Sequence, residues 1–346
     1  MTSSPPPPPP SASRRLNLSV HIAEAIGLEM EADPNIVVLG EDVGAMGGVF
    51  GTTRDLQRRF GEWRVRDTPI SEMGFTGMAV GLALAGLRPL VEVMFVDFIG
   101  VCLEQVYNAM AKNHYMSGGH VEMPIVLKTA GGCIGSAAQH SQCLWGTFAH
   151  LPGMRVVTPS SPYDARGMMA SALRSRDPVV YIEHKALLLL KDRDFPHVDS
   201  VPTERYATPL EGAAVVREGR DLTLATLSAG VRLALHAAGA LAEDGIDVEV
   251  IDLRAVVPLD AATVAASASR TGHLLVVDED YLSFGLSGEL ITRVIEHLSP
   301  GPLPTVARHA LPDVPIPAAR TLEEAVVPNA DSIARAARAL LARKRP

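Results

Sequence analysis

The sequence has few cysteines and no long apolar run. Only three cysteines, Cys102, Cys133 and Cys143, occur among its 346 residues, and no two of them form a Cys-x-x-Cys pair. This count excludes a disulfide scaffold and gives no indication of a zinc site in the chain. The longest apolar stretch, around 78–87, is shorter than the roughly 20 residues that cross a bilayer. We therefore expect no membrane span, and the unpaired thiols favour a cytoplasmic protein.

An excess of positive charge is also missing. The chain has 39 acidic against 31 basic residues, a formal net charge of −8. This balance argues against a surface that grips phosphate backbones, so no nucleic-acid partner is expected. The hydrophobic share of 47% excludes disorder of the whole chain. By length, two domains are expected.

The first residues form a separate segment. MTSSPPPPPPSASRR contains six consecutive prolines and no apolar core, so it is neither a secretory signal nor a membrane span. The prolines also prevent the amphipathic helix of an organelle transit peptide. We interpret residues 1–16 as a disordered, partly extended tail.

From Leu18 onward, apolar runs of strand length alternate with segments of helical period. This alternation is typical of an α/β fold in which parallel strands are joined by helical crossovers. In the first half, strands are expected over 36–39, 90–95, 125–128, 155–157 and 179–182, and helices over 19–31, 72–86, 101–116 and 162–174.

The helical and strand patterns break near 191–209, where charged residues and prolines lack periodicity. We expect a first domain over 17–192, a linker over 193–208 and a second α/β domain over 209–346. Its strands are expected over 222–226, 248–251 and 274–277, its helices over 231–243, 285–297 and 330–342, and an edge strand plus loop within 301–317.

The common phosphate-binding motifs are absent. The segment after the first strand, GEDVGAMGGVFG, lacks the Gly-x-Gly-x-x-Gly spacing and places two acids where a pyrophosphate would lie. No Gly-x-x-x-x-Gly-Lys-Ser/Thr occurs. Independent nucleotide binding is therefore not supported, and the glycines at 44, 47 and 48 are most simply a flexible loop.

Glu72 stands at the head of an apolar, small-residue-rich helix in DTPISEMGFTGMAVGLALAG. That composition predicts a helix buried on nearly all sides. Two interpretations remain open for the acid. It stabilises the helix start, with Thr68 as N-cap and Pro69 as the first helical residue, or it is a buried acid with a raised pKa that hydrogen-bonds a ligand nitrogen.

His140 lies in GGCIGSAAQHSQ, a stretch of small residues whose backbone can approach a ligand closely. It is either a proton donor or polar clamp, or a packing histidine. Phe95 and Phe98 fall at a predicted strand end, where open α/β sheets bind ligands. They either fill the core or stack on a flat heterocycle.

At these residues the sequence resembles the beta subunits of the thiamine-diphosphate-dependent 2-oxo-acid dehydrogenases, which include the pyruvate, branched-chain and acetoin enzymes. The resemblance covers nearly everything after the tail. Its matching stretches, in order, are LGEDVGAMGGVF (39–50), DTPISEMGFTGMAVGLALAGLRP (67–89), FVDFIGVCLEQVYNAMAKNHYMSGG (95–119), AAQHSQ (137–142), LPGMRVVTPSSPYDARGMM (151–169), DPVVYIEHKAL (177–187), VIDLRAVVPLD (250–260) and VVDED (276–280).

The resemblance implies a transketolase-like pyrimidine-binding domain followed by a transketolase C-terminal domain. In relatives, the acid matching Glu72 hydrogen-bonds the aminopyrimidine ring of thiamine diphosphate, which favours the imino tautomer that deprotonates the thiazolium carbon. The aromatic residue matching Phe98 lies against the pyrimidine, with the residues matching Met94 and Ile70 nearby.

The resemblance also implies roles for His140 and Glu41. The counterpart of His140 stands at the substrate side and assists acyl transfer to lipoamide. Glu41 matches an acid that some relatives place in a polar tunnel between paired active sites.

Thiamine diphosphate needs a divalent cation with oxygen ligands, and the family's Gly-Asp-Gly segment with a downstream Asn is absent from this sequence. We therefore expect no metal ligand in this chain. An alpha subunit should supply the Mg²⁺ and diphosphate contacts in an α2β2 heterotetramer, and this chain alone should be inactive.

The resulting hypothesis is an oxidoreductase acting on an oxo group with a lipoyl acceptor. It decarboxylates a small 2-oxo acid, with pyruvate favoured, and acylates the lipoyl group of a dihydrolipoyl acyltransferase. An acetoin dehydrogenase beta subunit is the alternative, since FVDFIGVCLEQ (95–105) is close to acetoin-cleaving members. A noncatalytic α/β scaffold subunit is the hypothesis from another class.

Overall fold

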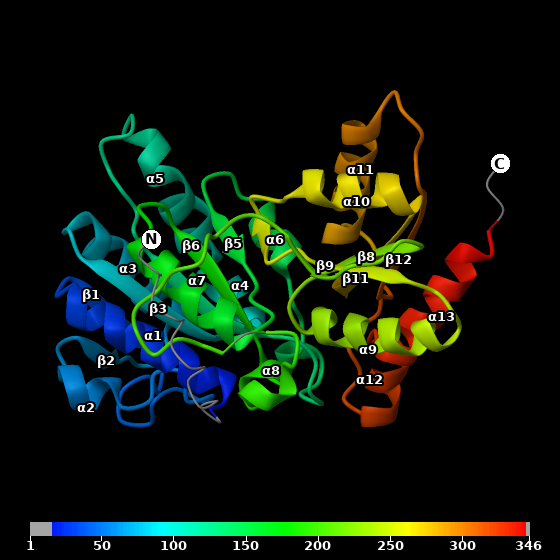
Figure 1. The fold of residues 1–346 in the computed structure, drawn as a ribbon. Helices are drawn as coiled ribbons and strands as arrows, with labels where there is room; N and C mark the ends of the chain where they lie inside the picture. The colour runs from blue at the N-terminus through cyan, green and yellow to red at the C-terminus, as the bar shows by residue number, and fades with distance from the viewer. Residues whose placement is uncertain (1–15, 199, 344–346) are drawn as a thin grey trace, which may run out of the picture.

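The computed structural model describes residues 16–198 and 200–343. It has two lobes, each built on a twisted sheet with helices on both faces (Figure 1). The tail expected over 1–16 lies outside the described residues except for Leu16, as do residues 344–346 at the end of the expected second domain. Two α/β units with mostly parallel strands agree with the expected fold class.

The first sheet has seven strands in the order β10-β5-β6-β4-β3-β1-β2. Every neighbouring pair is parallel except β10 and β5, which are antiparallel. The strands are β1 (Ile36–Gly40), β2 (Val65–Asp67), β3 (Arg88–Phe95), β4 (Val126–Gly131), β5 (Arg155–Val157), β6 (Val179–His184) and β10 (Ala255–Val257).

Helices cover both faces of this sheet, which explains why its central strands are continuous apolar runs. On one face α1 (Leu18–Ala32) packs against α7 (Pro162–Arg174). On the other lie α3 (Glu72–Leu84), α4 (Ile99–Glu104), the π-helical turn η2 (Gln105–Met110) and α5 (Ala111–Met116). Shorter pieces are α2 (Leu56–Phe60), η1 (Val96–Phe98), η3 (Ala138–His140), α6 (Trp145–Ala149), α8 (Lys185–Leu188) and η4 (Asp192–Asp194).

The second sheet has five strands in the order β12-β11-β8-β9-β7. In Figure 1, α10 and α11 lie above it and α9 and α13 below it. Its strands are β7 (Ala214–Arg217), β8 (Leu222–Thr226), β9 (Val248–Asp252), β11 (His273–Tyr281) and β12 (Thr305–Leu311). Its helices are α9 (Ala229–Glu243), α10 (Ala261–Thr271), α11 (Leu286–Leu298), α12 (Arg320–Val326) and α13 (Ala330–Leu341).

The two lobes share one hydrophobic core. The buried residues on the α3 side of the first sheet continue without a break into those of α10 and α11 in the second lobe. Strand β10, from the second half of the chain, completes the first sheet. The lobes are therefore packed together, and the domain limits expected over 17–192 and 209–346 stay predictions.

The expected edge strand within 301–317 is confirmed by β12, which is an outer strand. Helix α10 was not expected, because AATVAASASRT is rich in small and polar residues. Asp260 begins this helix, since its side chain accepts from the backbone N–H of Thr263 at 3.0 Å.

The expectation that the Glu72 helix is buried on nearly all sides is wrong for this chain. In α3, Phe75 and Ala79 are buried, whereas Met73 is 50% and Leu84 55% exposed. The helix covers the sheet with one face only, so its opposite apolar face remains open. The expected N-cap Thr68 is wrong as well: Ser71 precedes the helix, without a capping hydrogen bond from its side chain.

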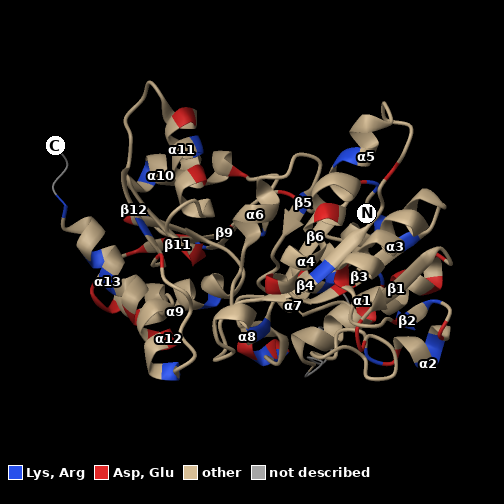
Figure 2. Cartoon of the chain, turned by 180° about the vertical axis from the view of Figure 1, so that it is seen from behind, with Lys and Arg blue, Asp and Glu red and all other residues tan. Residues whose placement is uncertain are grey.

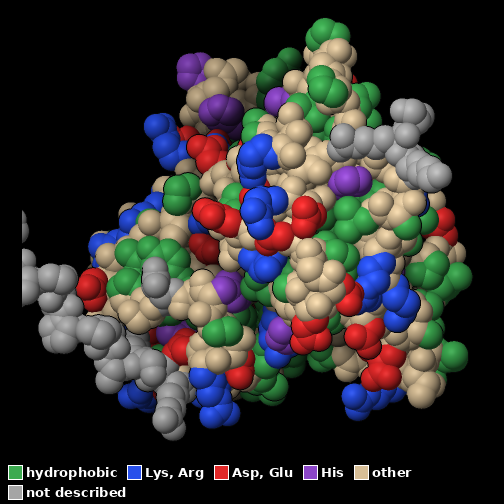
Figure 3. All heavy atoms as spheres, turned by 45° about the vertical axis from the view of Figure 1, so that its right-hand side comes forward, with side chains coloured by type: hydrophobic (Ala, Val, Ile, Leu, Met, Phe, Trp, Pro, Cys, Tyr) green, Lys and Arg blue, Asp and Glu red, His purple; other side chains and the backbone are tan. Residues whose placement is uncertain are grey.

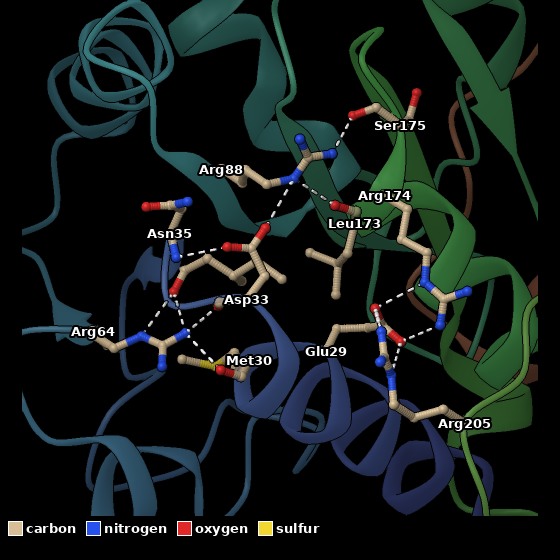
Figure 4. Close-up of polar contacts among 11 residues, drawn as sticks. Glu29, Met30, Asp33, Asn35, Arg64, Arg88, Leu173, Arg174, Ser175 and Arg205 are labelled. Atoms are coloured by element: carbon tan, nitrogen blue, oxygen red, sulfur yellow. Dashed lines mark hydrogen bonds and ion pairs between the residues drawn. The ribbon is translucent and has the colours of Figure 1, made fainter.

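Ion pairs tie α1 to segments distant in sequence (Figure 4). The carboxylate of Glu29 accepts from Arg174 in α7, at 2.6 and 2.9 Å, and from Arg205, which follows the irregular segment after α8. This bidentate pairing holds the segment between the two sheets against the first lobe. Elsewhere acidic and basic residues occur in both lobes (Figure 2), and their side chains are intermixed on the face seen in Figure 3.

A charged triad lies inside the first sheet. Lys128 in β4 places its Nζ 2.8 Å from Glu92 Oε2 and 2.9 Å from Glu183 Oε1, and all three side chains are at most 4% exposed. Within the part of the chain that the structure describes, no helix is both long and apolar enough to cross a membrane.

Candidate functional site

Four neighbouring strands of the first sheet end at one edge. In the order β6, β4, β3 and β1, they lead into Lys185, the loop of His140, Phe95 and Glu41. Because parallel strands point the same way, their carboxyl ends bring these segments together, and open α/β sheets bind ligands at such an edge. The sequence-predicted residues therefore converge on one region.

Two acids come close to each other at this edge. Glu41 directly follows β1, and Glu72 is the first residue of α3; both are half-buried. Burial raises the pKa of Glu41, and the nearby carboxylates of Glu72 and Asp42 raise it further. Like charges this close favour retention of a proton by Glu41. The carboxyl oxygens of both acids are therefore placed to accept hydrogen bonds from a ligand at this edge.

The loop after β1, which begins at Glu41, is closed by backbone hydrogen bonds. Its Gly48 N–H donates to the carbonyl of Asp42 at 2.8 Å. Gly47 has a φ of +80°, and a Cβ there would lie 2.8 Å from Cα of Arg54. Glycine is thus required at this position both by the backbone and by the close approach.

Aromatic rings gather at the end of β3. The ring of Phe95 contacts those of Phe50, Phe98 and His140, with centroids 5.9, 5.4 and 5.0 Å apart and edge-to-face geometry. Phe98 also contacts His140 at 5.4 Å. Phe98 is half-buried, so part of its surface is available for a flat ligand.

The His140 loop is held in an unusual conformation. Ala137, which precedes the 3₁₀ turn of His140, has φ 62° and ψ −179°, a region almost restricted to glycine, and Leu144 has φ 48°. Such residues cost about 1–3 kcal/mol each and persist only where the surroundings fix them. Here the N–H of Gly132 donates to Gln142 O at 3.0 Å, and Gln142 Nε2 donates to Asp97 Oδ1 at 2.8 Å.

The remaining predicted residues differ in their surroundings. Met94, near the end of β3, is half-buried. Ile70 is 83% exposed and extends the open apolar face of α3. In the isolated chain Ile70 therefore has no enclosing pocket wall.

Sequence reasoning missed three residues of this region: Lys185, Asp97 and Phe50. Lys185 is 3% exposed, and its Nζ donates to the carbonyl of His140. A lysine directly after the buried run VVYIEH was a usable indication, because a charged side chain at the end of a central strand needs a partner. Nothing in the sequence indicated that its partner would be a main-chain oxygen 45 residues away.

Cys143, His184 and Glu279 place potential metal ligands within 4.8 Å of one another. However, His184 Nδ1 accepts from the N–H of Ala186 at 3.2 Å, so the proton of the neutral ring lies on Nε2, which is 2.9 Å from Glu279 Oε2. Glu279 Oε1 accepts from the N–H of Cys133 at 2.8 Å. His184 and Glu279 therefore form a hydrogen-bonded contact between the two lobes.

A cavity of about 670 Å³ opens beside the His140 loop, between the two lobes. Ala138, Gln139 and Gln142 line it from the loop, and Tyr281 and Asp313 from the second lobe. Ligand sites in proteins have volumes of this order.

Comparisons with known proteins match both lobes. Residues 15–190 match the transketolase pyrimidine-binding domain and residues 211–333 the transketolase C-terminal domain. The chain is 40% identical over 337 residues to the beta subunit of an acetoin:2,6-dichlorophenolindophenol oxidoreductase of Cupriavidus necator, covering 94% of this chain and 97% of that protein.

Pyruvate dehydrogenase E1 beta subunits are similarly related. The Bacillus subtilis protein is 40% identical, with 92% of this chain and 97% of that protein covered, and a mitochondrial protein of Oryza sativa is 40% identical, with 94% and 86% covered. The fold resembles a solved split-gene transketolase, described as an inactive beta4 tetramer, with a TM-score of 0.76, 22% identity, and 96% of this chain and 100% of that chain covered.

Proposed function

The chain belongs to the transketolase-like family of beta subunits of thiamine-diphosphate-dependent 2-oxo-acid dehydrogenases, and on that premise we propose that it completes a pyruvate-type enzyme together with an alpha subunit. The observation that carries the proposal is the convergence of Glu72, Glu41, Phe98 and His140 on the carboxyl edge of one sheet. The four residues come from segments up to 99 positions apart in sequence (140 − 41).

The donor set fits the aminopyrimidine end of thiamine diphosphate. Glu72 is half-buried and would hydrogen-bond a ring nitrogen, and the accessible part of Phe98 would pack against the ring, with the half-buried Met94 near the end of the adjoining strand β3. Burial and the neighbouring carboxylate of Glu72 raise the pKa of Glu41, which stands beside Glu72. When bound, the cofactor supplies the nucleophilic carbon and the electron sink for decarboxylation; the protein residues orient the ring and exchange its proton.

The ligands for the diphosphate end of the cofactor must come from another chain. Mg²⁺ requires oxygen ligands around it, and the family's Gly-Asp-Gly segment is absent from the sequence. The alpha subunit provides these ligands in an α2β2 heterotetramer. The open face of α3 suits this partner because this face begins next to Glu72. It carries the exposed side chains of Met73 and Leu84, and at Gly81 a Cβ would meet nothing within 4 Å. A flat apolar face of this kind permits close packing of a second subunit.

His140 acts on the side where the acyl group leaves. His140 is half-buried, and the cavity of about 670 Å³ lined by Ala138 and Gln139 of the same loop gives the lipoyl arm of an acyltransferase room to approach. His140 then stabilises charge or moves a proton during reductive acylation of the lipoyl group. The free thiols of the three cysteines suit a reducing compartment, and we place the enzyme in the cytoplasm.

Acetoin is the second candidate substrate. The 40% identity to the Cupriavidus necator acetoin enzyme subunit supports it as specifically as the Bacillus subtilis relative supports pyruvate. Both substrates are small, and the pocket wall that would select between them includes the partner subunit. An activity assay with both compounds is therefore needed to choose between acetoin and pyruvate.

The test is purification of the chain alone and together with its alpha subunit, followed by assay with thiamine diphosphate, Mg²⁺ and an artificial electron acceptor. We expect turnover of pyruvate by the complex and none by either chain alone. Turnover of acetoin but not pyruvate would establish the second candidate. A well-formed complex without activity on acetoin or any small 2-oxo acid would indicate a scaffold subunit instead.

A further inference from the structure

Lys185 lies directly beneath the loop that carries His140. It is the first residue of α8, and its Nζ donates to the carbonyl oxygen of His140. The same ammonium lies over the ring of Phe95, 5.2 Å from the centroid, and the Phe95 ring contacts the imidazole at 5.0 Å. Lys185 thus contacts His140 through its main chain and through the ring against which its side chain packs.

The placement of Lys185 is costly unless these contacts compensate for it. The side chain is 3% exposed, and within residues 16–198 and 200–343 it makes no ion pair within 4.0 Å. Burial lowers its pKa, while Asp97 and Glu279 nearby favour the charged form. A buried ammonium needs hydrogen bonds to offset desolvation, and the carbonyl of His140 provides one.

The loop itself needs an anchor at this point. Ala137 is held at φ 62° and ψ −179°, so without external contacts the loop would relax to a less strained conformation. The contacts of Gln142 with Asp97 fix the far side of the loop. Lys185 fixes its centre, at the residue proposed to assist acyl transfer.

We propose that Lys185 is a positioning residue for His140, which locks the 137–142 loop so that the imidazole faces the acyl-transfer side of the site. The inference rests on the proposed function, because its catalytic consequence is seen in lipoyl acylation. It also makes a prediction for the loop alone, which does not depend on that function.

The test uses the complex with the alpha subunit and the variants Lys185→Met, Lys185→Gln and Lys185→Arg. Methionine is one atom shorter than lysine and keeps an unbranched apolar chain, but it has neither the charge nor the N–H donors. Lys191→Met is the matched control: Lys191 belongs to the same segment but lies where the chain pairs with Asn17. We expect Lys185→Met to lower kcat for lipoyl acylation about tenfold or more, with KM for the 2-oxo acid and the rate of decarboxylation changed less than about threefold. Arginine should recover most of the loss, and Lys191→Met should match the wild type.

Hydrogen exchange of the peptide 134–142 gives the second measurement. We expect this peptide to exchange about tenfold faster in Lys185→Met than in the wild type. Exchange in Lys185→Gln should be slower than in Lys185→Met, because glutamine keeps an N–H donor. If the methionine variant does not assemble, Lys185→Gln and Lys185→Arg are compared instead: faster exchange of 134–142 and lower lipoyl acylation in the glutamine variant than in the arginine variant support the proposal, and wild-type values in both overturn it. Unchanged exchange and acylation in Lys185→Met, or equal loss in both half-reactions, would overturn it. If the wild-type complex has no activity, the proposed function fails while the exchange result still decides whether Lys185 anchors the loop.

Discussion

Replacement of Lys128 by methionine should destabilise the protein by about 3–5 kcal/mol, because it leaves buried carboxylates without their cation. Lys128 Nζ lies 2.8 Å from Glu92 and 2.9 Å from Glu183, and all three side chains are almost wholly inaccessible. One ammonium serves two carboxyl groups. Burial raises the pKa of Glu183 to about 7, and Lys128 is the largest influence that opposes this rise.

The pH dependence of the loss follows from that pKa. Without Lys128, the pKa of Glu183 in the folded state rises further above its unfolded value. A carboxyl whose folded pKa is raised contributes most favourably below its unfolded pKa, and this contribution is lost as the pH rises through the folded pKa. The destabilisation by Lys128→Met should therefore be smaller at pH 5.5 than at pH 8.

The assay is urea unfolding of the purified chain at both pH values, followed by circular dichroism. Lys128→Met combined with Glu183→Gln should recover about 1–3 kcal/mol, because one buried carboxyl group has been removed. Arg293→Met is the control: its pair with Glu289 is about half exposed on both sides, so its loss should cost less than about 1 kcal/mol. A Lys128→Met chain within about 1 kcal/mol of wild type, or a double variant less stable than the single one, would refute the reasoning.

Three further variants test other parts of the account. Glu72→Gln should leave the complex with the alpha subunit assembled but lower turnover by about 10²–10⁴, because the amide cannot exchange a proton with the pyrimidine; wild-type turnover would remove Glu72 from the mechanism. His140→Ala should impair lipoyl acylation more than decarboxylation, measured with lipoyl and artificial acceptors, and equal impairment of both would show its role to be different. Burial raises the pKa of Asp252 to about 7, so the ionisation of this one group should lower the wild-type free energy of unfolding in urea by about 2 kcal/mol between pH 5.5 and pH 8. Asp252→Asn should remove that contribution, and the same pH dependence of the unfolding free energy in both proteins would contradict the assignment.

The elements that the sequence predicted well have strong periodicity. Helix α7 and strands β5 and β8 have the expected bounds, because Ser161 and Pro162 mark the helix start and apolar residues fill the strands. Helix α10 escaped prediction because alanine, serine and threonine leave no clear apolar stripe. Strand β10 was not predicted because it has only three residues and depends on pairing with β5 more than on local propensity. The paired residues Val157 and Ala255 are 98 positions apart in the sequence.

The candidate site shows the same division. Phe98 and His140 were recognisable because they follow predicted strands, and the carboxyl ends of parallel strands share one edge of the sheet, whereas Glu41 was named only through the family resemblance. The exposure of α3 was mispredicted because an apolar helix face can be covered either by the core of its own chain or by another subunit, and the sequence does not distinguish the two cases. Lys185 was missed because its partner is a backbone oxygen, which leaves no trace in the side-chain sequence.

The most direct test of the account is calorimetric titration of thiamine diphosphate with Mg²⁺ into this chain alone, into the alpha subunit alone and into their complex. If the two chains divide the cofactor between them, the complex should bind about a thousandfold more tightly than this chain alone, a difference of about 4 kcal/mol. Binding to the isolated chain as tight as binding to the complex would contradict the claim that a second subunit holds the diphosphate.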